Sequence, residues 1–230
     1  MKKISLVVAA TVIAVASFAQ VRFGAQVIGN AGSISTNTDD LENVTNQMKI
    51  SGGGGLVADF SFGEKFAIRP SLNFLQKNGG IEYKTELLPG KTSTVKTMLN
   101  YLELPVQFVY KIPMNNMTAF IGAGPSIGYG VSGKIKVKGW IYEDNEGDET
   151  DELIEIAESV DAFKKEADGG AELKRFDLSA HAVAGVEFKS GFYVNAGYMA
   201  GLANLAKSSD DKFKTRGIQL TVGFLFPSKQ

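Results

Sequence analysis

The sequence predicts an all-β protein, an eight-stranded antiparallel transmembrane β-barrel with short periplasmic turns and long outer loops. Three observations carry this prediction. Apolar residues alternate with small or polar ones along eight segments, which is the two-residue period of a strand. The connections between these segments alternate between long polar loops and short turns. A secretion signal opens the chain, and no later apolar run approaches the roughly 20 residues of a spanning helix, so only a closed sheet could cross a membrane.

The first 19 residues have the pattern of a signal peptide. Lys2 and Lys3 give a positive start, residues 4–16 are predominantly apolar, and residues 17–19 form a small-x-small cleavage site. We therefore expect residues 20–230 to be one barrel domain, secreted across the inner membrane. An N-terminal membrane anchor is the alternative, but no stop-transfer pattern follows the apolar run.

Charge and composition exclude several classes of site and partner. The chain has 24 basic and 25 acidic residues, and loss of Lys2 and Lys3 with the signal leaves 22 basic residues and a net charge of −3. This near balance argues against a nucleic-acid partner. The chain has no cysteine, so it can form neither a disulfide nor a thiolate metal site. We expect no cofactor and no bound metal.

The first four strands are expected at residues 21–30, 53–62, 66–76 and 99–111. Each has a large apolar face, represented in turn by Phe23, Leu56, Leu72 and Phe108, and a small or polar face, represented by Arg22, Asp59, Arg69 and Glu103. Pro70 cannot donate to a ladder and predicts a local bulge in the third strand. That strand is expected to end at Gln76, which leaves a polar loop with Lys77, Lys84, Lys91 and Lys96.

The last four strands are expected from residue 117 onward and at residues 176–188, 192–202 and 217–226. In the fifth, alternation continues through Val131, Ile135 and Val137, so we expect this strand to project beyond the membrane. The last strand has the clearest pattern. One face carries only apolar residues, and the other is small or polar apart from Leu225.

Aromatic residues flank the predicted short turns and are expected to form an interfacial girdle: Phe62, Phe66, Tyr110, Phe188, Phe192 and Phe226. The alternative is a soluble β-sandwich or a lipocalin-like barrel, which would turn its large apolar residues inward. The charged residues of the central strands instead share the face that is rich in glycine, serine and asparagine. This distribution favours the membrane barrel.

The inward face of the predicted barrel carries seven ionisable residues: Asp59, Arg69, Glu103, Lys111, Asp177, His181 and Glu187. The interior of an eight-stranded barrel is filled by side chains, and buried charges there must pair. We expect a structural polar network, with Arg69 between Asp59 and Glu103. The alternative is a narrow gated ion path.

His181 is the only histidine, and Ser179 and Glu187 share its predicted face, so the strand has the ingredients of a hydrolytic triad. That face is the lumen, where a lipid substrate could not reach. Alternation also places the Ser179 and His181 side chains about 7 Å apart, too far for direct proton transfer. We therefore expect a packed interior histidine and no catalytic residues.

A long acidic outer loop is expected at about residues 134–175, and residues 143–161 include ten acidic residues and no basic one. Asp144, Glu146 and Asp148 could ligate Ca²⁺, although the EF-hand pattern fails at Glu149. A solvated acidic loop is favoured. Within it, the spacing of Leu153, Ile156, Ala157 and Val160 predicts a short amphipathic helix.

Two strands carry a family resemblance. The sequence YLELPV at residues 101–106, followed by Tyr110 and Lys111, and the sequence IGAGPSIGY at residues 121–129 resemble strands of the PorT-like outer-membrane β-barrel domain family. The resemblance implies an eight-stranded barrel of the OmpA-like size class in the Gram-negative cell envelope. Some relatives are linked to protein secretion, but no residue here carries that role over.

These observations predict a cell outer membrane protein with a structural or interaction role and no catalytic activity. A transport or protein-secretion accessory and an outer-membrane barrel hydrolase are the alternatives. The expected partners are outer-membrane lipid, the barrel-assembly machinery during insertion, and an unidentified protein at the outer loops.

Overall fold

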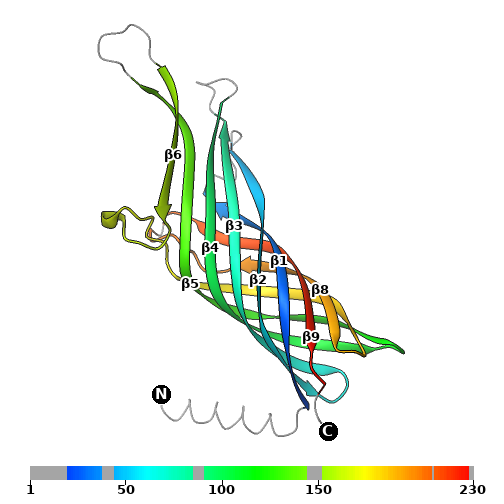
Figure 1. Cartoon of the computed structure of the whole chain (residues 1–230). Coiled ribbons are helices and arrows are strands. Elements are labelled where there is room, and N and C mark those ends of the chain that lie inside the picture. Colours follow the sequence, from blue (N-terminus) through cyan, green and yellow to red (C-terminus); the bar gives the residue numbers. More distant parts are fainter. Residues whose placement is uncertain (1–19, 38–43, 85–90, 144–151, 209, 228–230) are drawn as a thin grey trace, which may run out of the picture.

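The computed structural model describes residues 20–37, 44–84, 91–143, 152–208 and 210–227. Within them it has one 3-10 turn, Glu166–Asp168, and nine strands (Figure 1): β1 Gln20–Thr36, β2 Val44–Phe62, β3 Phe66–Lys84, β4 Thr92–Pro113, β5 Met117–Glu143, β6 Glu152–Asp161, β7 Phe176–Phe188, β8 Phe192–Gly201 and β9 Phe213–Leu225. No helix in these ranges is long and apolar enough to cross a membrane.

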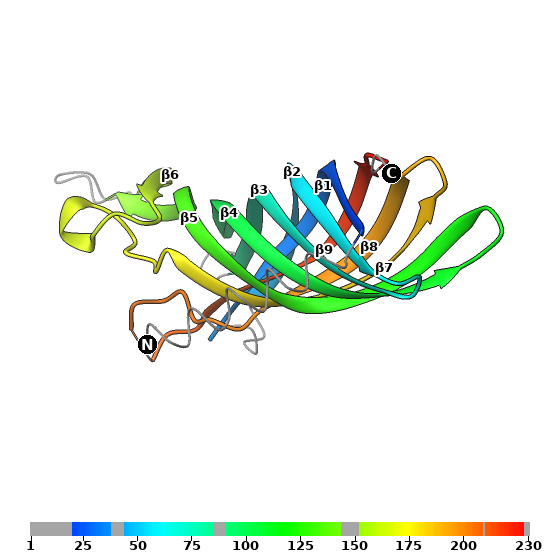
Figure 2. The same cartoon turned by 90° about the horizontal axis from the view of Figure 1, so that it is seen from below.

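Eight of the strands close a ring. The order is β1-β2-β3-β4-β5-β7-β8-β9, and β9 pairs back to β1; every pairing in the ring is antiparallel. Figure 2 shows these strands side by side as a continuous curved wall. The predicted eight-stranded antiparallel barrel is confirmed. β6 lies outside the ring and pairs only with β5 among the strands of the structure's described ranges.

The two faces of the barrel wall are those that the alternation predicts. Large apolar side chains point outward, with Phe23 64% and Phe108 62% exposed. Charged side chains point inward, with Asp59 fully buried. A soluble barrel would have the opposite arrangement, because water rather than hydrocarbon would surround it.

Aromatic contacts mark both edges of the apolar band. At the short turns, the ring centroids of Phe66 and Tyr110 lie 5.4 Å apart and those of Phe188 and Phe192 lie 6.0 Å apart. At the opposite edge, Tyr129 on β5 contacts Phe176 on β7 at 5.2 Å. Met117 pairs with Phe188 and Tyr129 with Phe176, so 12 residues of β5 separate the two edges. At roughly 3.3 Å per residue and a tilt of about 45°, these residues span about 28 Å, close to a hydrocarbon core.

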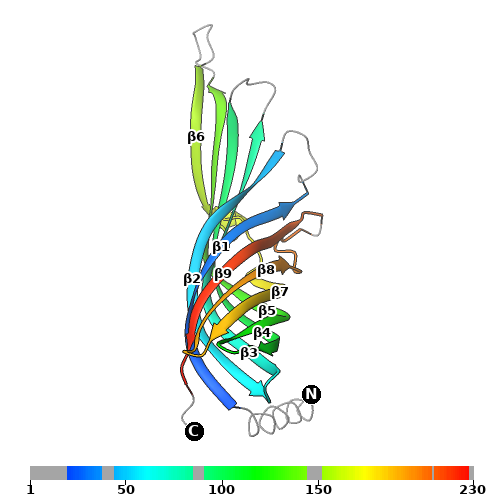
Figure 3. The same ribbon diagram turned by 90° about the vertical axis from the view of Figure 1, so that its right-hand side faces the viewer.

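Most strands are longer at the outer rim than the sequence predicts. β3 continues to Lys84, β4 begins at Thr92 and β5 runs to Glu143. Figures 1 and 3 show β6 and the upper parts of β2 to β5 standing beyond the ends of β7, β8 and β9. Above the membrane both faces meet water, so the apolar–polar alternation that reveals a strand is lost there.

The acidic outer segment corrects two predictions. The stretch expected as one loop at about 134–175 begins with the end of β5, which pairs with β6 from Lys134↔Asp161 to Glu143↔Glu152. The amphipathic helix predicted around Ile156 is wrong, because β6 occupies those residues. Backbone pairing with β5 outweighs the helical spacing. The Ca²⁺ candidates Asp144, Glu146 and Asp148 lie outside the described residues.

Pro70 does not cause a bulge. β3 pairs with β4 at Pro70↔Val106 and again at Asn73↔Glu103 with unchanged register. The same holds on its other side, where Val57↔Ser71 and Phe60↔Ile68 share one register with β2. The pairing is interrupted but no extra residue is inserted, since proline only removes a donor.

Candidate functional site in the barrel interior

All seven ionisable residues predicted for the interior are buried inside the barrel, each at most 7% exposed. The structure groups six of them into two ion clusters, one near the periplasmic turns and one near the outer rim. His181, the seventh, belongs to neither ion cluster. Two further cations, Arg22 and Lys77, complete the clusters.

The cluster near the periplasmic turns is centred on Asp59. Arg69 donates to Oδ2 of Asp59 from Nε at 2.9 Å and from Nη2 at 2.6 Å, and Nη2 also lies 3.1 Å from Glu187. Lys111 Nζ lies 2.8 Å from Oδ1 of Asp59. Arg22 adds contacts to Glu187 at 2.5 Å and to Asp59 at 3.5 Å.

This geometry corrects the predicted neighbours of Arg69, which bridges Asp59 and Glu187 rather than Asp59 and Glu103. In the β3–β4 register, Arg69 lies opposite Gln107, whereas Glu103 lies opposite Asn73. Glu103 is thus four residues further along the strand, roughly 13 Å away at the usual rise. Alternation gives the face of a residue but not its height in the barrel.

The cluster near the outer rim is centred on Lys77. Its ammonium lies 2.5 Å from Oε1 of Glu103 and 2.8 Å from Oδ2 of Asp177. Thr215 donates to the same Oδ2 at 3.0 Å. Lys77 also lies 4.9 Å from the centroid of the Tyr101 ring, a cation–π contact.

The predicted interior network does not include Arg22 or Lys77, and each omission has an identifiable reason. The predicted third strand ends at Gln76, one residue before Lys77, whereas β3 continues to Lys84. The parity of Lys77 matches that of Arg69, which is the signal that could have found it. Arg22 was placed on the polar face of the first strand but was not included in the network.

The charges of the two clusters are unequal. The periplasmic cluster holds three cations (Arg22, Arg69, Lys111) and two carboxylates, and the outer cluster holds one cation and two carboxylates. The two excess charges are opposite and cancel across the interior. Lys77 is the only basic group in the described residues that ion-pairs with the outer carboxylates, so the outer cluster depends on it.

Ser179 and His181 are in contact, contrary to the separation of about 7 Å predicted for them. Ser179 Oγ lies 3.2 Å from His181 Nε2, because the two side chains on one face lean toward each other. Glu187 does not join them, since it is engaged by Arg22 and Arg69. The structure therefore assembles two members of the possible triad and keeps the third in another cluster. Both residues are at most 5% exposed.

An apolar plug closes the outer mouth. Phe163, Ala162 and Leu205 pack against Leu99 and Tyr101. A Cβ built on Gly130 would lie 2.3 Å from the Phe163 ring, so this glycine makes the space that the ring occupies.

The approach of Phe163 is fixed by polar contacts. The Asp161 carboxylate accepts the backbone N–H groups of Phe163 at 2.8 Å and Lys164 at 3.0 Å, and these bonds lower the pKa of Asp161. Arg175 donates to the Gly130 carbonyl at 2.8 Å, and its guanidinium lies 4.9 Å from the Phe163 ring centroid.

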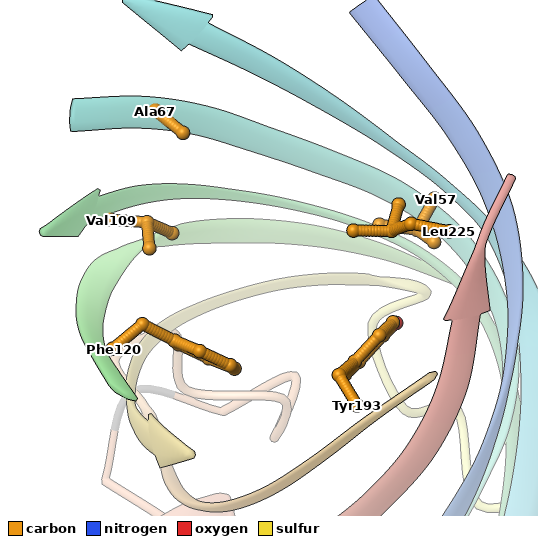
Figure 4. Close-up of a cluster of buried hydrophobic side chains, with 6 residues drawn as sticks. All are labelled: Val57, Ala67, Val109, Phe120, Tyr193 and Leu225. Carbon is orange, nitrogen blue, oxygen red and sulfur yellow. The ribbon is translucent and has the colours of Figure 1, made fainter. Parts of the chain in front are cut away.

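A second apolar cluster occupies the periplasmic half of the interior (Figure 4). Its members are Val57, Ala67, Val109, Phe120, Tyr193 and Leu225. The Arg69 guanidinium lies 4.7 Å from the Phe120 ring centroid and 5.3 Å from that of Tyr193. Between this cluster and the outer ion cluster lies a cavity of about 20 Å³, lined in part by His181, Asn73 and Gln219. That volume suits one or two waters rather than a substrate.

The residues present offer little metal chemistry. Within the described ranges, no group of three or more histidine and carboxylate side chains is arranged to hold a metal ion. What the interior can do is neutralise its own charges, rigidify the wall and close the lumen.

Comparison with known proteins agrees with this architecture. A family model described as outer membrane protein beta-barrel domain matches residues 18–207. No curated protein matches the sequence at the significance required.

Solved structures of similar fold include three outer-membrane proteins. The attachment invasion locus protein Ail of Yersinia pestis is 14% identical, with 90% of this chain and 99% of that chain covered and a TM-score of 0.40. OprG of Pseudomonas aeruginosa is 12% identical, with 90% and 95% covered and a TM-score of 0.41. The outer membrane enzyme PagL is 11% identical, with 86% and 98% covered and a TM-score of 0.39.

Proposed function

The chain belongs to the outer membrane protein beta-barrel domain family and lies in the cell outer membrane, and we propose that it is a structural or interaction barrel without catalytic activity. The observation that carries the proposal is the closed lumen. Ion clusters fill the interior, Phe163 plugs the outer mouth, and a second apolar cluster fills the periplasmic half.

The interaction role is supported by the projecting sheet. β6 and the upper halves of β3, β4 and β5 extend past the aromatic edge at Tyr129 and Phe176. Strand pairing holds this sheet in a defined shape, so it can present a surface at less entropic loss than a free loop. Anchoring in lipid and assembly by the barrel-assembly machinery belong to the same proposal, as does a protein partner at the outer rim.

A transport or secretion-accessory role is the second candidate. It rests on the resemblance of residues 101–106 and 121–129 to a family with relatives linked to secretion, and no residue here carries that role over. Such a role through the lumen would require both ion clusters to rearrange. A hydrolase is the third, supported by the 3.2 Å contact between Ser179 and His181. Within the described residues, no printed hydrogen bond joins a carboxylate to His181, and Ser179 is buried.

Two assays on the refolded protein separate these candidates. We expect no conductance in planar bilayers, and no labelling by a serine-reactive phosphonate probe. Conductance that is lost in Arg69→Ala would support transport, and labelling that is lost in His181→Ala would support the hydrolase; either result contradicts the proposal.

The interaction role has its own test in cells. A photo-crosslinking residue placed at Val137, on the projecting part of β5, should give a discrete protein adduct. The same residue at Phe108, in the middle of the lipid-facing band, is the matched control and should give lipid adducts alone. Identical adduct patterns at the two positions would argue against a partner at this sheet.

A further inference from the structure

We propose that the outward face of the projecting sheet holds a binding site for the phosphate groups of the outer-leaflet glycolipid. Its cations are Lys96 on β4 and Lys134 and Lys136 on β5. All three are exposed. This site goes beyond the proposed structural or interaction role.

Strand register brings the three lysines together. Lys136 is directly opposite Lys96, so both point to the same face of the sheet. Lys134 lies two residues from Lys136 on that face, diagonal to Lys96. Like charges directly opposite one another destabilise a sheet, unless an anion lies between them.

The three ammonium groups have no counterion of their own in the described part of the chain. Lys138, next along the same face, ion-pairs with Glu155 at 3.5 Å. Asp161 lies opposite Lys134 in the ladder, but its Oδ1 accepts the backbone N–H groups of Phe163 and Lys164. No ion pair within 4 Å joins Lys96, Lys134 or Lys136 to any described carboxylate.

Below the lysines, a row of polar side chains crosses three strands. Gln76 on β3 donates to Asn100 on β4 at 3.2 Å, and Asn100 donates to Ser132 on β5 at 2.9 Å. These three residues line an open groove together with Met98, Gly133, Lys134 and Asp161. The Asp161 carboxylate in this groove is engaged by the backbone N–H groups of Phe163 and Lys164. The Ser132 hydroxyl accepts from Asn100, so its own proton remains available to a ligand oxygen.

The height of the groove fits a lipid headgroup. Leu102 and Tyr129 pair at the aromatic edge of the apolar band, and Asn100 and Ser132 pair one step above it. Lys134 and Lys136 follow at about 7 Å intervals along β5. Apolar, hydrogen-bonding and cationic side chains therefore succeed one another in the order in which a glycolipid presents acyl chains, sugars and phosphates. Clusters of lysine next to a membrane span recognise anionic lipid in this manner.

The test uses the mature protein in phosphatidylcholine nanodiscs, with diphosphorylated lipid A added and bound lipid counted by native mass spectrometry. The triple variant Lys96→Gln, Lys134→Gln, Lys136→Gln should bind roughly 10- to 100-fold more weakly, given the contribution of each lysine near a charged surface. The matched control removes three exposed lysines elsewhere, two of them in the periplasmic turns: Lys65→Gln, Lys189→Gln, Lys212→Gln. It should change binding less than about 2-fold, as expected for charges beyond a Debye length.

Further arms identify the ligand. Dephosphorylated lipid A should bind the wild type and the triple variant equally weakly. The heat-induced gel shift checks that each variant is folded, and the single variant Lys136→Gln serves if the triple variant is not. Equal binding by the two triple variants would overturn the proposal. So would displacement of the lipid by inorganic phosphate or by poly-glutamate, which would indicate a site for free anions or for an acidic polypeptide.

Discussion

The ammonium of Lys77 on β3 lies 2.8 Å from Oδ2 of Asp177 on β7, 100 positions later in the chain. The same ammonium holds Glu103 on β4. One lysine thereby ties three strands of the ring together beneath the outer mouth. The other carboxylate oxygen of Asp177 is buried and has no hydrogen-bond partner in the described residues.

Replacement of Lys77 by methionine should destabilise the barrel strongly. The methionine keeps the length of the side chain but leaves Glu103 and Asp177 buried without a cation. Loss of one partner from a buried ion pair typically lowers the free energy of unfolding by about 3–5 kcal/mol. Urea unfolding followed by the heat-induced gel shift measures the change.

The matched control is Lys189→Met in the periplasmic turn, where the side chain is exposed and the change should be within about 0.5 kcal/mol. Restoration of stability by the triple variant Lys77→Met, Glu103→Gln, Asp177→Asn would confirm that the loss arises from unpaired charge. Equal effects of Lys77→Met and Lys189→Met would contradict the structure.

Gly130→Ala should displace the plug. The added Cβ would lie 2.3 Å from the Phe163 ring, well inside contact distance. The aromatic ring is rigid, so it cannot bend its end away from the clash. We expect the change to lower stability by about 1–3 kcal/mol, as overpacking does. Thermal unfolding measures it.

A second substitution makes this test specific. Phe163→Leu removes part of the clashing ring, so Gly130→Ala should be less harmful in that background than alone. Gly139→Ala serves as a control, because its nearest neighbour would be at an acceptable 3.4 Å. Strict additivity of the Gly130 and Phe163 changes would show that the two residues are not in contact.

The sequence was sufficient for the ring and the faces because lipid and lumen impose a strict alternation on each strand. Phe108 and Asp59 could be assigned to opposite faces from parity alone. Parity does not give height, which is why Arg69 was paired with Glu103 instead of Glu187. It also fails above the membrane, where both faces are wet. β6 lies there and follows no such alternation. Lys77 is buried and keeps the parity of Arg69, so it is lost only because the pattern ends the third strand one residue early. The turn of the Ser179 side chain toward His181 depends on rotamers that no pattern encodes.

The plug should loosen in acid because of Asp161. Backbone N–H donation from Phe163, together with that from Lys164, lowers the pKa of this carboxyl in the folded protein. A depressed folded pKa stabilises the fold above the unfolded pKa, ordinarily about 3.9, and this contribution is lost as pH falls through the folded value. The amide of Phe163 should therefore exchange hydrogen faster, after correction for intrinsic rates, as pH falls below about 4.

Asp161→Asn provides the control for this pH dependence. Its amide oxygen can still accept both backbone N–H groups but does not titrate, so corrected exchange at Phe163 should be flat over the same pH range. Asp161→Ala should exchange fast at every pH. A wild-type profile as flat as that of the asparagine variant would show that the carboxylate does not hold the plug.

Phe108→Arg should be far more harmful than Val131→Arg, although both positions point outward from neighbouring strands. Phe108 pairs with Ala123, midway between the aromatic edges at Met117 and Tyr129, which places it at the centre of the hydrocarbon. Arginine at the midplane of a membrane barrel typically lowers stability by about 2–4 kcal/mol, whereas near an interface the effect falls to about 0–1 kcal/mol.

Val131 lies just beyond Tyr129, 44% exposed, where an arginine can reach water and headgroups. Folding titrations in vesicles of one lipid measure both variants. Equal losses in vesicles, or a Phe108→Arg protein that is stable without detergent, would contradict the position assigned to the bilayer.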